Sequence, residues 1–154
     1  MPDINWKCTF FDALTPYELY SIIKLRNEVF VVEQNCIFQD ADAKDLSCYH
    51  LMGFAASDLA AYARLVPAGV SFDDMSIGRI VTSPHYRSKG LGKALMRHAI
   101  NHCNLLFGEQ SIKIGAQLYL KDFYESFGFQ QINDVYDEDG IPHIKMIRKK
   151  EERM

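Results

Sequence analysis

Arg87-Ser88-Lys89-Gly90-Leu91-Gly92 is the stretch that decides the fold of this 154-residue chain. Its two glycines lack a Cβ atom, so the backbone can approach an anion closely, and basic side chains flank them, including that of Lys93. The apolar residues between Leu91 and Ala99 keep a helical spacing, so the turn opens a helix whose positive dipole end faces the same point. The sequence therefore predicts a loop that holds a phosphate group.

The spacing of this loop excludes two common phosphate motifs. A Walker-type loop requires glycine where Arg87 stands and serine or threonine where Ala94 stands. A dinucleotide fingerprint requires a third small residue where Leu95 stands. A basic turn that simply caps a helix is the remaining alternative to a phosphate site.

Composition and charge limit the class of protein. A formal net charge of -3 and a pI near 5.9 argue against a nucleic-acid or anionic-membrane partner, because such binding needs clustered positive charge. The N-terminus lacks a signal-peptide pattern, and no apolar run approaches ~18 residues. The four cysteines form no Cys-x-x-Cys pair. We therefore expect a single domain over residues 1–154, cytoplasmic, with reduced thiols. The oligomeric state is open, with a homodimer among the options.

Hydrophobic periodicity predicts an α/β fold with a mixed sheet and helices on both of its faces. A capping box at Thr15-Pro16-Tyr17-Glu18 starts the first helix, which should end near Glu33 or Gln34. The helix after the phosphate loop should end near Phe107 with Gly108 as its cap. A short helix is expected at Leu118–Phe127. The expected strands are Trp6–Phe11, Cys48–Ala56, Leu59–Val66, Met75–Val81, Ser111–Gln117, Phe129–Tyr136 and Ile141–Arg148.

Three segments resemble the GNAT superfamily of acetyl-CoA-dependent N-acetyltransferases. The loop from Arg87 to Gly92 fits that family's pattern Gln/Arg-x-x-Gly-x-Gly/Ala. Ala116 to Phe129 is similar to its second signature, in which a tyrosine on a short helix precedes a Gly-Phe pair, and Leu25 to Gln34 resembles the ElaA-type branch. The resemblance implies a GNAT-like fold in the order β-α-β-β-β-α-β-α-β-β. It also implies acetyl-CoA as co-substrate, no metal, and direct transfer to an amine of a small molecule or an exposed protein amine.

The same resemblance assigns contacts with the coenzyme. The strand before the loop would hold the pantetheine arm, with the Ile80 N–H near the thioester oxygen, and the loop would hold the pyrophosphate. A polar residue on the next strand would add a contact. The expected coenzyme-binding residues are Ile80, Val81, Thr82, Arg87, Ser88, Lys89, Gly90, Leu91, Gly92, Lys93 and Gln117.

Tyr124 matches the family's general acid, since a phenol suits a thiol leaving group whose reference pKa is near 8.5. The alternative for Tyr124 is a packed aromatic residue beside Phe123 and Phe127. The general base is open, because Ser76 stands where some relatives carry a glutamate. Freeing a lysine-like amine at pH 7 costs roughly 4.6 kcal/mol, against roughly 1 for an α-amine. Candidates for the base or for substrate contacts are Glu33, His50, Asp74 and His143.

Other readings stay open at this point. The loop with Asp40, Asp42 and Asp45 is either solvated or a wall that attracts a cationic amine, and it lacks the EF-hand spacing. His98 and His102 are expected to be packed histidines rather than metal ligands. Two rival functions are a catalytically silent acetyl-CoA-binding module and an acyltransferase that relays the acetyl group through Cys36 or Cys48.

Overall fold

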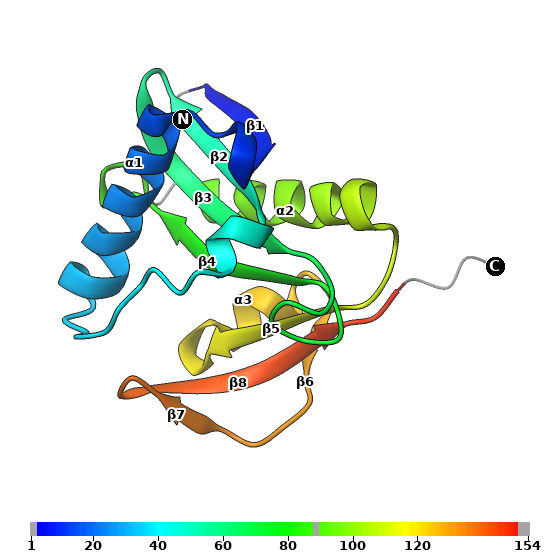
Figure 1. The fold of residues 1–154 in the computed structure, drawn as a ribbon. Coiled ribbons are helices and arrows are strands. Elements are labelled where there is room, and N and C mark those ends of the chain that lie inside the picture. Colours follow the sequence, from blue (N-terminus) through cyan, green and yellow to red (C-terminus); the bar gives the residue numbers. More distant parts are fainter. Residues whose placement is uncertain (1–2, 88–89, 151–154) are drawn as a thin grey trace.

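The computed structural model describes residues 3–87 and 90–150, whose strands form two antiparallel sheets (Figure 1). The first sheet has the order β1-β2-β3-β4, and in the second β8 lies between β5 and β6 and also pairs with β7. The strands are β1 (Ile4–Phe10), β2 (Tyr49–Ala55), β3 (Asp58–Val66), β4 (Ser76–Thr82), β5 (Ile112–Gln117), β6 (Phe129–Gln131), β7 (Tyr136–Glu138) and β8 (Ile141–Arg148).

The two sheets meet at one end only, between β4 and β5. A parallel bridge joins Met75 to Ile112, and the N–H of Lys113 donates to the Met75 carbonyl at 3.0 Å. Past this bridge the described parts of β4 and β5 have no pairing, and Figure 1 shows the two strands diverging. The strand before the phosphate loop therefore splays away from β5.

A helix lies on each face of the first sheet. Helix α1 (Pro16–Arg26) begins with the expected capping box, in which the Glu18 N–H donates to the Thr15 hydroxyl oxygen at 3.1 Å. It continues without a break as the π-helical segment η2 (Asn27–Glu33), so the predicted end near Glu33 is confirmed. Its apolar side packs on Met52 and Tyr62.

Helix α2 (Leu91–Phe107) covers the opposite face, where Leu95 and Ala99 share a core with Leu51 and Ala63. Leu51 and Met52 are neighbours in β2 but point to opposite faces, as the pleat of a strand requires. The core under α2 also includes Ile114 of β5, so this one helix holds the two sheets together. Gly108 ends α2 with a φ of +87°, which confirms the predicted cap.

The second sheet differs in detail from the expected elements. The single strand predicted for Phe129–Tyr136 is divided into β6 and β7. The Asn133 side-chain oxygen accepts from the Lys145 N–H at 2.7 Å, so a side chain takes the place of a ladder carbonyl there. The helix predicted for Leu118–Phe127 is a 3-10 turn, η5 (Leu118–Leu120), followed by α3 (Lys121–Glu125). Further 3-10 turns are η1 (Phe11–Ala13), η3 (Lys44–Ser47) and η4 (Pro84–Tyr86).

Gly53 is required by the packing between β1 and α2. It pairs with Trp6, whose ring stacks on His98 of α2 with the ring centroids 4.3 Å apart. A Cβ atom at Gly53 would lie 2.8 Å from Trp6 Cζ3, which is too close for any real contact.

We predict that Gly53→Ala lowers the free energy of unfolding by about 1–3 kcal/mol, because the indole ring must move off its position. Thermal unfolding, followed by far-ultraviolet circular dichroism in both backgrounds, measures this change. In a Trp6→Leu background the same substitution should cost much less. An equal cost in both backgrounds would show that the ring is not the obstacle.

Candidate functional site

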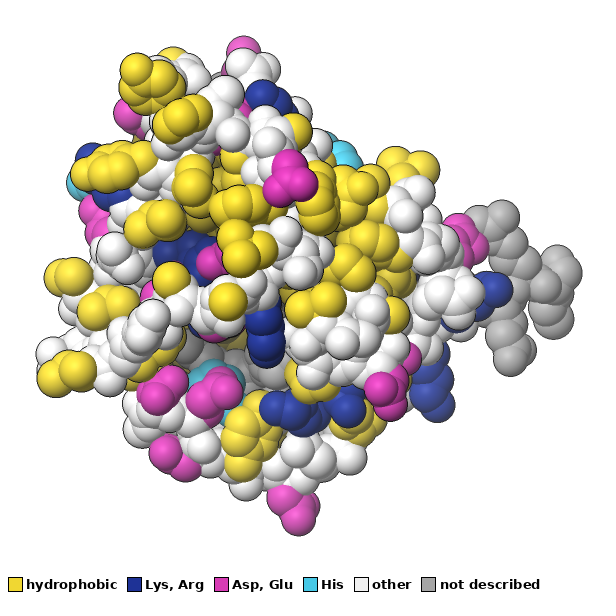
Figure 2. Space-filling model, in the orientation of Figure 1, with side chains coloured by type: hydrophobic (Ala, Val, Ile, Leu, Met, Phe, Trp, Pro, Cys, Tyr) yellow, Lys and Arg dark blue, Asp and Glu magenta, His cyan; other side chains and the backbone are white. Residues whose placement is uncertain are grey.

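A cleft of about 580 Å³ opens where β4 and β5 part. Its walls come from β4, from η2 with the loop after it, from the first turn of α2, from η5 with α3, and from β5, β7 and β8. Acidic side chains gather at one rim of this face, over β7 and its turn (Figure 2). The cleft therefore runs from the predicted phosphate loop at one end to the β7–β8 turn at the other.

The phosphate-loop end is an uncapped helix terminus. Gly90 is the N-cap of α2 with a φ of +76°, a conformation that favours glycine, and it has no side chain that could cap the helix. By helix geometry the first N–H groups of α2, those of Leu91 to Lys93, have no acceptor within the helix. These donors and the dipole of a 17-residue helix fit an anion.

The expected loop residues are placed as follows. Gly92 lines the cleft, and Leu91 has its side chain in the core, so only its backbone can meet a ligand. Lys93 is exposed and is not part of the lining. Ser88 and Lys89 lie outside the described residues.

Arg87 also lines the cleft, where it is already engaged by a carboxylate. Its guanidinium pairs with Glu33, with Nη2 2.8 Å from Oε1 and Nη1 donating to Oε2 at 3.0 Å, and its Nε donates to the Thr82 carbonyl at 3.3 Å. Glu33 sits at the end of η2 and also lines the cleft. An anion bound at the loop would therefore compete with Glu33 for Arg87.

The β4 wall contains a β-bulge at the place expected for the thioester. Tyr62 pairs with Val81 and Arg64 with Gly78, so Arg79 and Ile80 together oppose the single residue between Tyr62 and Arg64. Arg79 adopts a φ of +48°, a left-handed conformation that costs a residue with a side chain about 1–2 kcal/mol. Ile80, Val81 and Thr82 line the cleft. On the side that faces β5, their backbone groups have no strand partner in the described part of the chain.

Tyr124 lies in the cleft wall and is 6% exposed. Its ring packs edge-on against Phe123 and Phe129, so it is part of the core as well as of the cleft. Its hydroxyl has no hydrogen-bond partner among the described residues, and burial raises the pKa of Tyr124 above its usual range, with a smaller effect from Tyr119. The phenol is therefore protonated near neutral pH and free to donate.

His143 lies at the other end of the cleft and is 8% exposed. Its Nδ1 is 2.7 Å from the Ile141 carbonyl oxygen, and its Nε2 is 3.2 Å from Glu138 Oε2. A carbonyl can only accept, so Nδ1 carries a proton, and the contact of Nε2 with the Glu138 carboxylate is favourable when Nε2 carries one as well. Gln117 of β5 pairs with His143 across the sheet and also lines the cleft.

Sequence reasoning missed several residues of this end. Phe30, Gln34, Phe38, Glu138 and Ile141 line the cleft, on η2, on the loop after it and on the β7–β8 turn. The signal for the turn was present in Asp137-Glu138-Asp139-Gly140, but nothing local indicates that it faces η2. The Cys36 thiol donates to the Asp139 carbonyl at 3.4 Å, which brings together segments 103 residues apart.

Two other candidates lie away from the cleft. His50 is fully buried, with Nδ1 2.6 Å from the Tyr62 hydroxyl and Nε2 2.9 Å from the Asp45 carbonyl. Burial lowers the pKa of His50, so it is a neutral structural histidine. Asp74 precedes β4 and is not part of the lining. Cys48 is fully buried outside the lining, and burial raises its pKa to about 11, which argues against a cysteine relay through it.

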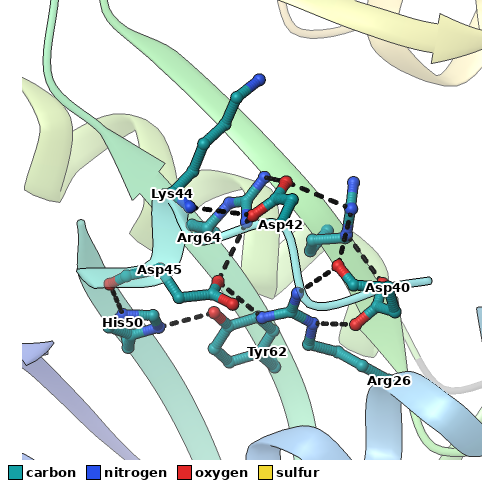
Figure 3. A network of polar contacts seen from close by, with 9 residues as sticks. Arg26, Asp40, Asp42, Lys44, Asp45, His50, Tyr62 and Arg64 are labelled. Carbon is teal, nitrogen blue, oxygen red and sulfur yellow. Dashed lines mark hydrogen bonds and ion pairs between the residues drawn. The ribbon is translucent and has the colours of Figure 1, made fainter. Parts of the chain in front are cut away.

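The three aspartates of the acidic loop neither face solvent freely nor line the cleft, so both expectations for them were wrong. Asp40, Asp42 and Asp45 turn inward and pair with three arginines from α1, β3 and β4 (Figure 3). Burial acts to raise the pKa of Asp45, but hydrogen bonds and charge from Arg26 and Arg64 outweigh it, so this pKa is lowered. The carboxylates are therefore the counter-charges of buried arginines.

Residues 3–87 and 90–150 contain neither a candidate metal cluster nor a helix that could span a membrane. No group of three or more His, Cys, Asp or Glu side chains there could hold a metal ion. His98 stacks on Trp6, and His102 Nδ1 lies 2.7 Å from the His98 carbonyl oxygen. None of the helices in these ranges has both the length and the apolar character needed to cross a membrane.

Known proteins resemble this chain over nearly its whole length. A family model described as an acetyltransferase (GNAT) domain matches residues 50–150. Protein ElaA of Escherichia coli (strain K12) is 38% identical over 148 residues, which is 95% of this chain and 97% of that protein. Its crystal structure matches with a TM-score of 0.90 at 38% identity and covers 96% of this chain and 100% of that chain. An acyl-CoA N-acyltransferase from Pseudomonas aeruginosa matches with a TM-score of 0.91 at 39% identity, covering 95% of this chain and 99% of that one.

We predict that Glu33→Gln tightens the binding of coenzyme A by about two- to fivefold, because Arg87 loses a competing carboxylate and exposed ion pairs contribute up to about 1 kcal/mol. Calorimetric titration measures the change, which should shrink at high salt. Glu28→Gln makes the same chemical change on the same helical segment and should leave the affinity as it is. Unchanged or weaker binding in Glu33→Gln would show that Arg87 does not meet the anion.

Proposed function

We propose that this chain, which belongs to the GNAT family of acetyltransferases, transfers the acetyl group of acetyl-CoA to a primary amine. The amine would attack directly in a ternary complex. The acceptor is a small molecule or an exposed protein amine. The observation that supports this most is the convergence of three features on one cleft, namely the uncapped N-terminus of α2, the unpaired edge of β4 and the hydroxyl of Tyr124. Each of the three suits a different part of an acyl-CoA molecule.

The coenzyme would be held by backbone groups at two places. The N–H groups of the first turn of α2, with Arg87, suit its pyrophosphate, and hydrogen bonds to charged groups contribute about 1.5–3 kcal/mol each. The free edge of β4 suits its pantetheine amides, with Thr82 nearest the loop and the Ile80 N–H as donor to the thioester oxygen. Acetyl-CoA supplies an acyl thioester whose carbonyl carbon accepts the amine nitrogen.

Tyr124 would act on the leaving sulfur. Its O–H has no partner among the described residues, so it can donate to the sulfur as negative charge develops there. Burial makes the phenolate costly, so Tyr124 keeps its proton at neutral pH and acts first as a hydrogen-bond donor. Coenzyme A would then leave as a thiolate stabilised by this hydrogen bond and take its proton from solvent, because the buried phenol is a weaker acid than the thiol.

His143 is the residue we propose as general base. The ring lines the cleft, and because Nδ1 donates to the Ile141 carbonyl, Nε2 is the nitrogen that would gain and lose the second proton. Glu138, 3.2 Å from Nε2, would stabilise the imidazolium formed when the ring takes a proton from the amine. Glu33 is a poorer base because it is bound to Arg87, and it fits better as an attraction for a cationic amine.

A release assay tests the proposal as a whole. Wild-type protein with acetyl-CoA and a panel of primary amines should release free thiol in proportion to the acetylated amine, which mass spectrometry identifies. Coenzyme binding without amine-dependent release would instead support the silent binding module, which the presence of Ser76 in place of the strand glutamate suggests. Absence of coenzyme binding would overturn both.

We predict that Tyr124→Phe lowers kcat by about a hundredfold or more and leaves the Kd for coenzyme A within about twofold of the wild-type value, because only the proton donor is lost. Steady-state kinetics and calorimetry measure the two quantities. Tyr20→Phe, at an exposed tyrosine on α1, is the matched control. Equal kcat in Tyr124→Phe and wild type would remove the acid role from Tyr124.

We predict that His143→Gln lowers kcat/KM for a lysine-like amine by about a hundredfold at pH 7, because no positioned base then remains to accept the proton of the amine. The deficit should shrink as pH rises, since the amine increasingly arrives unprotonated. The comparison of pH profiles for wild type and variant measures this. A deficit of the same size at every pH would assign His143 to binding rather than to proton transfer.

A further inference from the structure

Asp40 connects the two walls of the cleft without lining it. It is 7% exposed, and its two carboxylate oxygens serve different arginines, with Arg26 Nε 2.7 Å from Oδ2 and Arg79 Nε 2.8 Å from Oδ1. Its backbone carbonyl accepts from the same two side chains, at 3.2 Å from Arg26 and 3.0 Å from Arg79. Figure 3 shows Asp40 on its loop beside Arg26 at the end of α1.

The contact with Arg26 joins the two ends of residues 27–39. We call this segment the acceptor wall because it contains Glu33, the residue proposed to attract a cationic amine. Arg26 is the last residue of α1, and Asp40 follows the loop after η2, so their ion pair holds residues 27–39 at both ends. This closed segment contributes Phe30, Glu33, Gln34, Cys36 and Phe38 to the cleft. The position of the acceptor wall therefore depends on the Arg26–Asp40 pair.

The contact with Arg79 holds the opposite wall. Arg79 is the left-handed residue of the β4 bulge, and it comes directly before Ile80, whose N–H is the proposed donor to the thioester oxygen. A side chain in this conformation is disfavoured, so the bulge requires compensating contacts. Asp40 supplies two of the three hydrogen bonds of the Arg79 guanidinium, and Asp42 Oδ2 accepts the third at 3.3 Å.

We propose that Asp40 is a positioning residue of the reaction. It holds β4, which carries the Ile80 N–H, through Arg79, and it holds the acceptor wall, residues 27–39, through Arg26. The inference rests on the proposed function for its catalytic consequence. Its structural consequence is separate: loss of the Asp40 charge loosens residues 27–39 and β4 together. The first turn of α2 lies outside this network, and Arg87 of the phosphate loop reaches the two walls only at their ends, through Glu33 and the Thr82 carbonyl.

The experiment compares Asp40→Asn with wild type by hydrogen exchange and kinetics. We expect exchange of peptides covering 27–39 and 76–82 to rise together by about tenfold or more, with β5 and β8 unchanged. We expect kcat to fall by about tenfold to a hundredfold, which is more than the accompanying rise in the Kd for coenzyme A, because the first turn of α2 is unchanged. Asp134→Asn, the same change at an exposed loop position, is the control and should alter neither quantity.

Arg79→Lys gives a second, independent test, because it keeps the positive charge but loses the planar fork that serves Asp40. It should loosen 76–82 and lower kcat while 27–39 exchanges as in wild type. If Asp40→Asn does not fold, this variant decides the matter. Unchanged exchange at 76–82 in a folded variant, or loosening of only one wall in Asp40→Asn, overturns the proposal. Should wild type transfer acetyl to no amine, the proposed function fails, and the exchange comparison still decides whether Asp40 joins the walls.

Discussion

The whole site depends on β4 and β5 being joined at one end only. Had the pairing at Met75 and Ile112 continued, the two sheets would form one continuous sheet, with every backbone group of β4 satisfied. Because the strands part, donors and acceptors of β4 face a cleft and require another partner. A ligand with its own amide groups is the partner that such an edge can accept. On the other edge of β4, the bulge at Arg79 and Ile80 interrupts the ladder with β3, which bends the strand beside the opening.

Buried charge holds this open arrangement in place. Arg26, Arg64 and Arg79 project from apolar elements on the α1 side of the first sheet, and Asp40, Asp42 and Asp45 neutralise them. Removing one member of such a group leaves an uncompensated charge, which is far more costly than a lost surface pair. Because the pKa of Asp45 is lowered in the folded state, its contribution to stability is present above about pH 4 and is lost as the pH falls below that. The network is therefore intact wherever amine chemistry is feasible.

The sequence predicted the features that depend on neighbouring residues. The capping box at Thr15, the glycine cap at Gly108 and the loop before α2 are local patterns, and each was placed correctly. Features that depend on distant contacts were missed.

The acidic loop could not be placed from its own composition, because its partners are up to 39 residues away. One signal was available: arginines within the apolar runs of β3 and β4 require counter-charges, and the aspartates of residues 40–45 had no other partner. The divided strand after Phe129 depends on one side-chain oxygen, that of Asn133.

The distribution of charge along the cleft gives it a direction. Its α2 end presents N–H groups that have no acceptor within the helix, together with a helix dipole and Arg87, all favourable to an anion. Its far end presents Glu138 and the carbonyl-fixed ring of His143, both favourable to a protonated amine. Glu33 lies between these ends and is bound to Arg87. A bound pyrophosphate would draw Arg87 away and leave the Glu33 carboxylate uncompensated inside the cleft. The anion at the α2 end would therefore increase the attraction of Glu33 for a cationic amine. Under the proposed function, coenzyme binding would therefore strengthen amine binding through this ion pair, and linkage requires amine binding to strengthen coenzyme binding by the same factor.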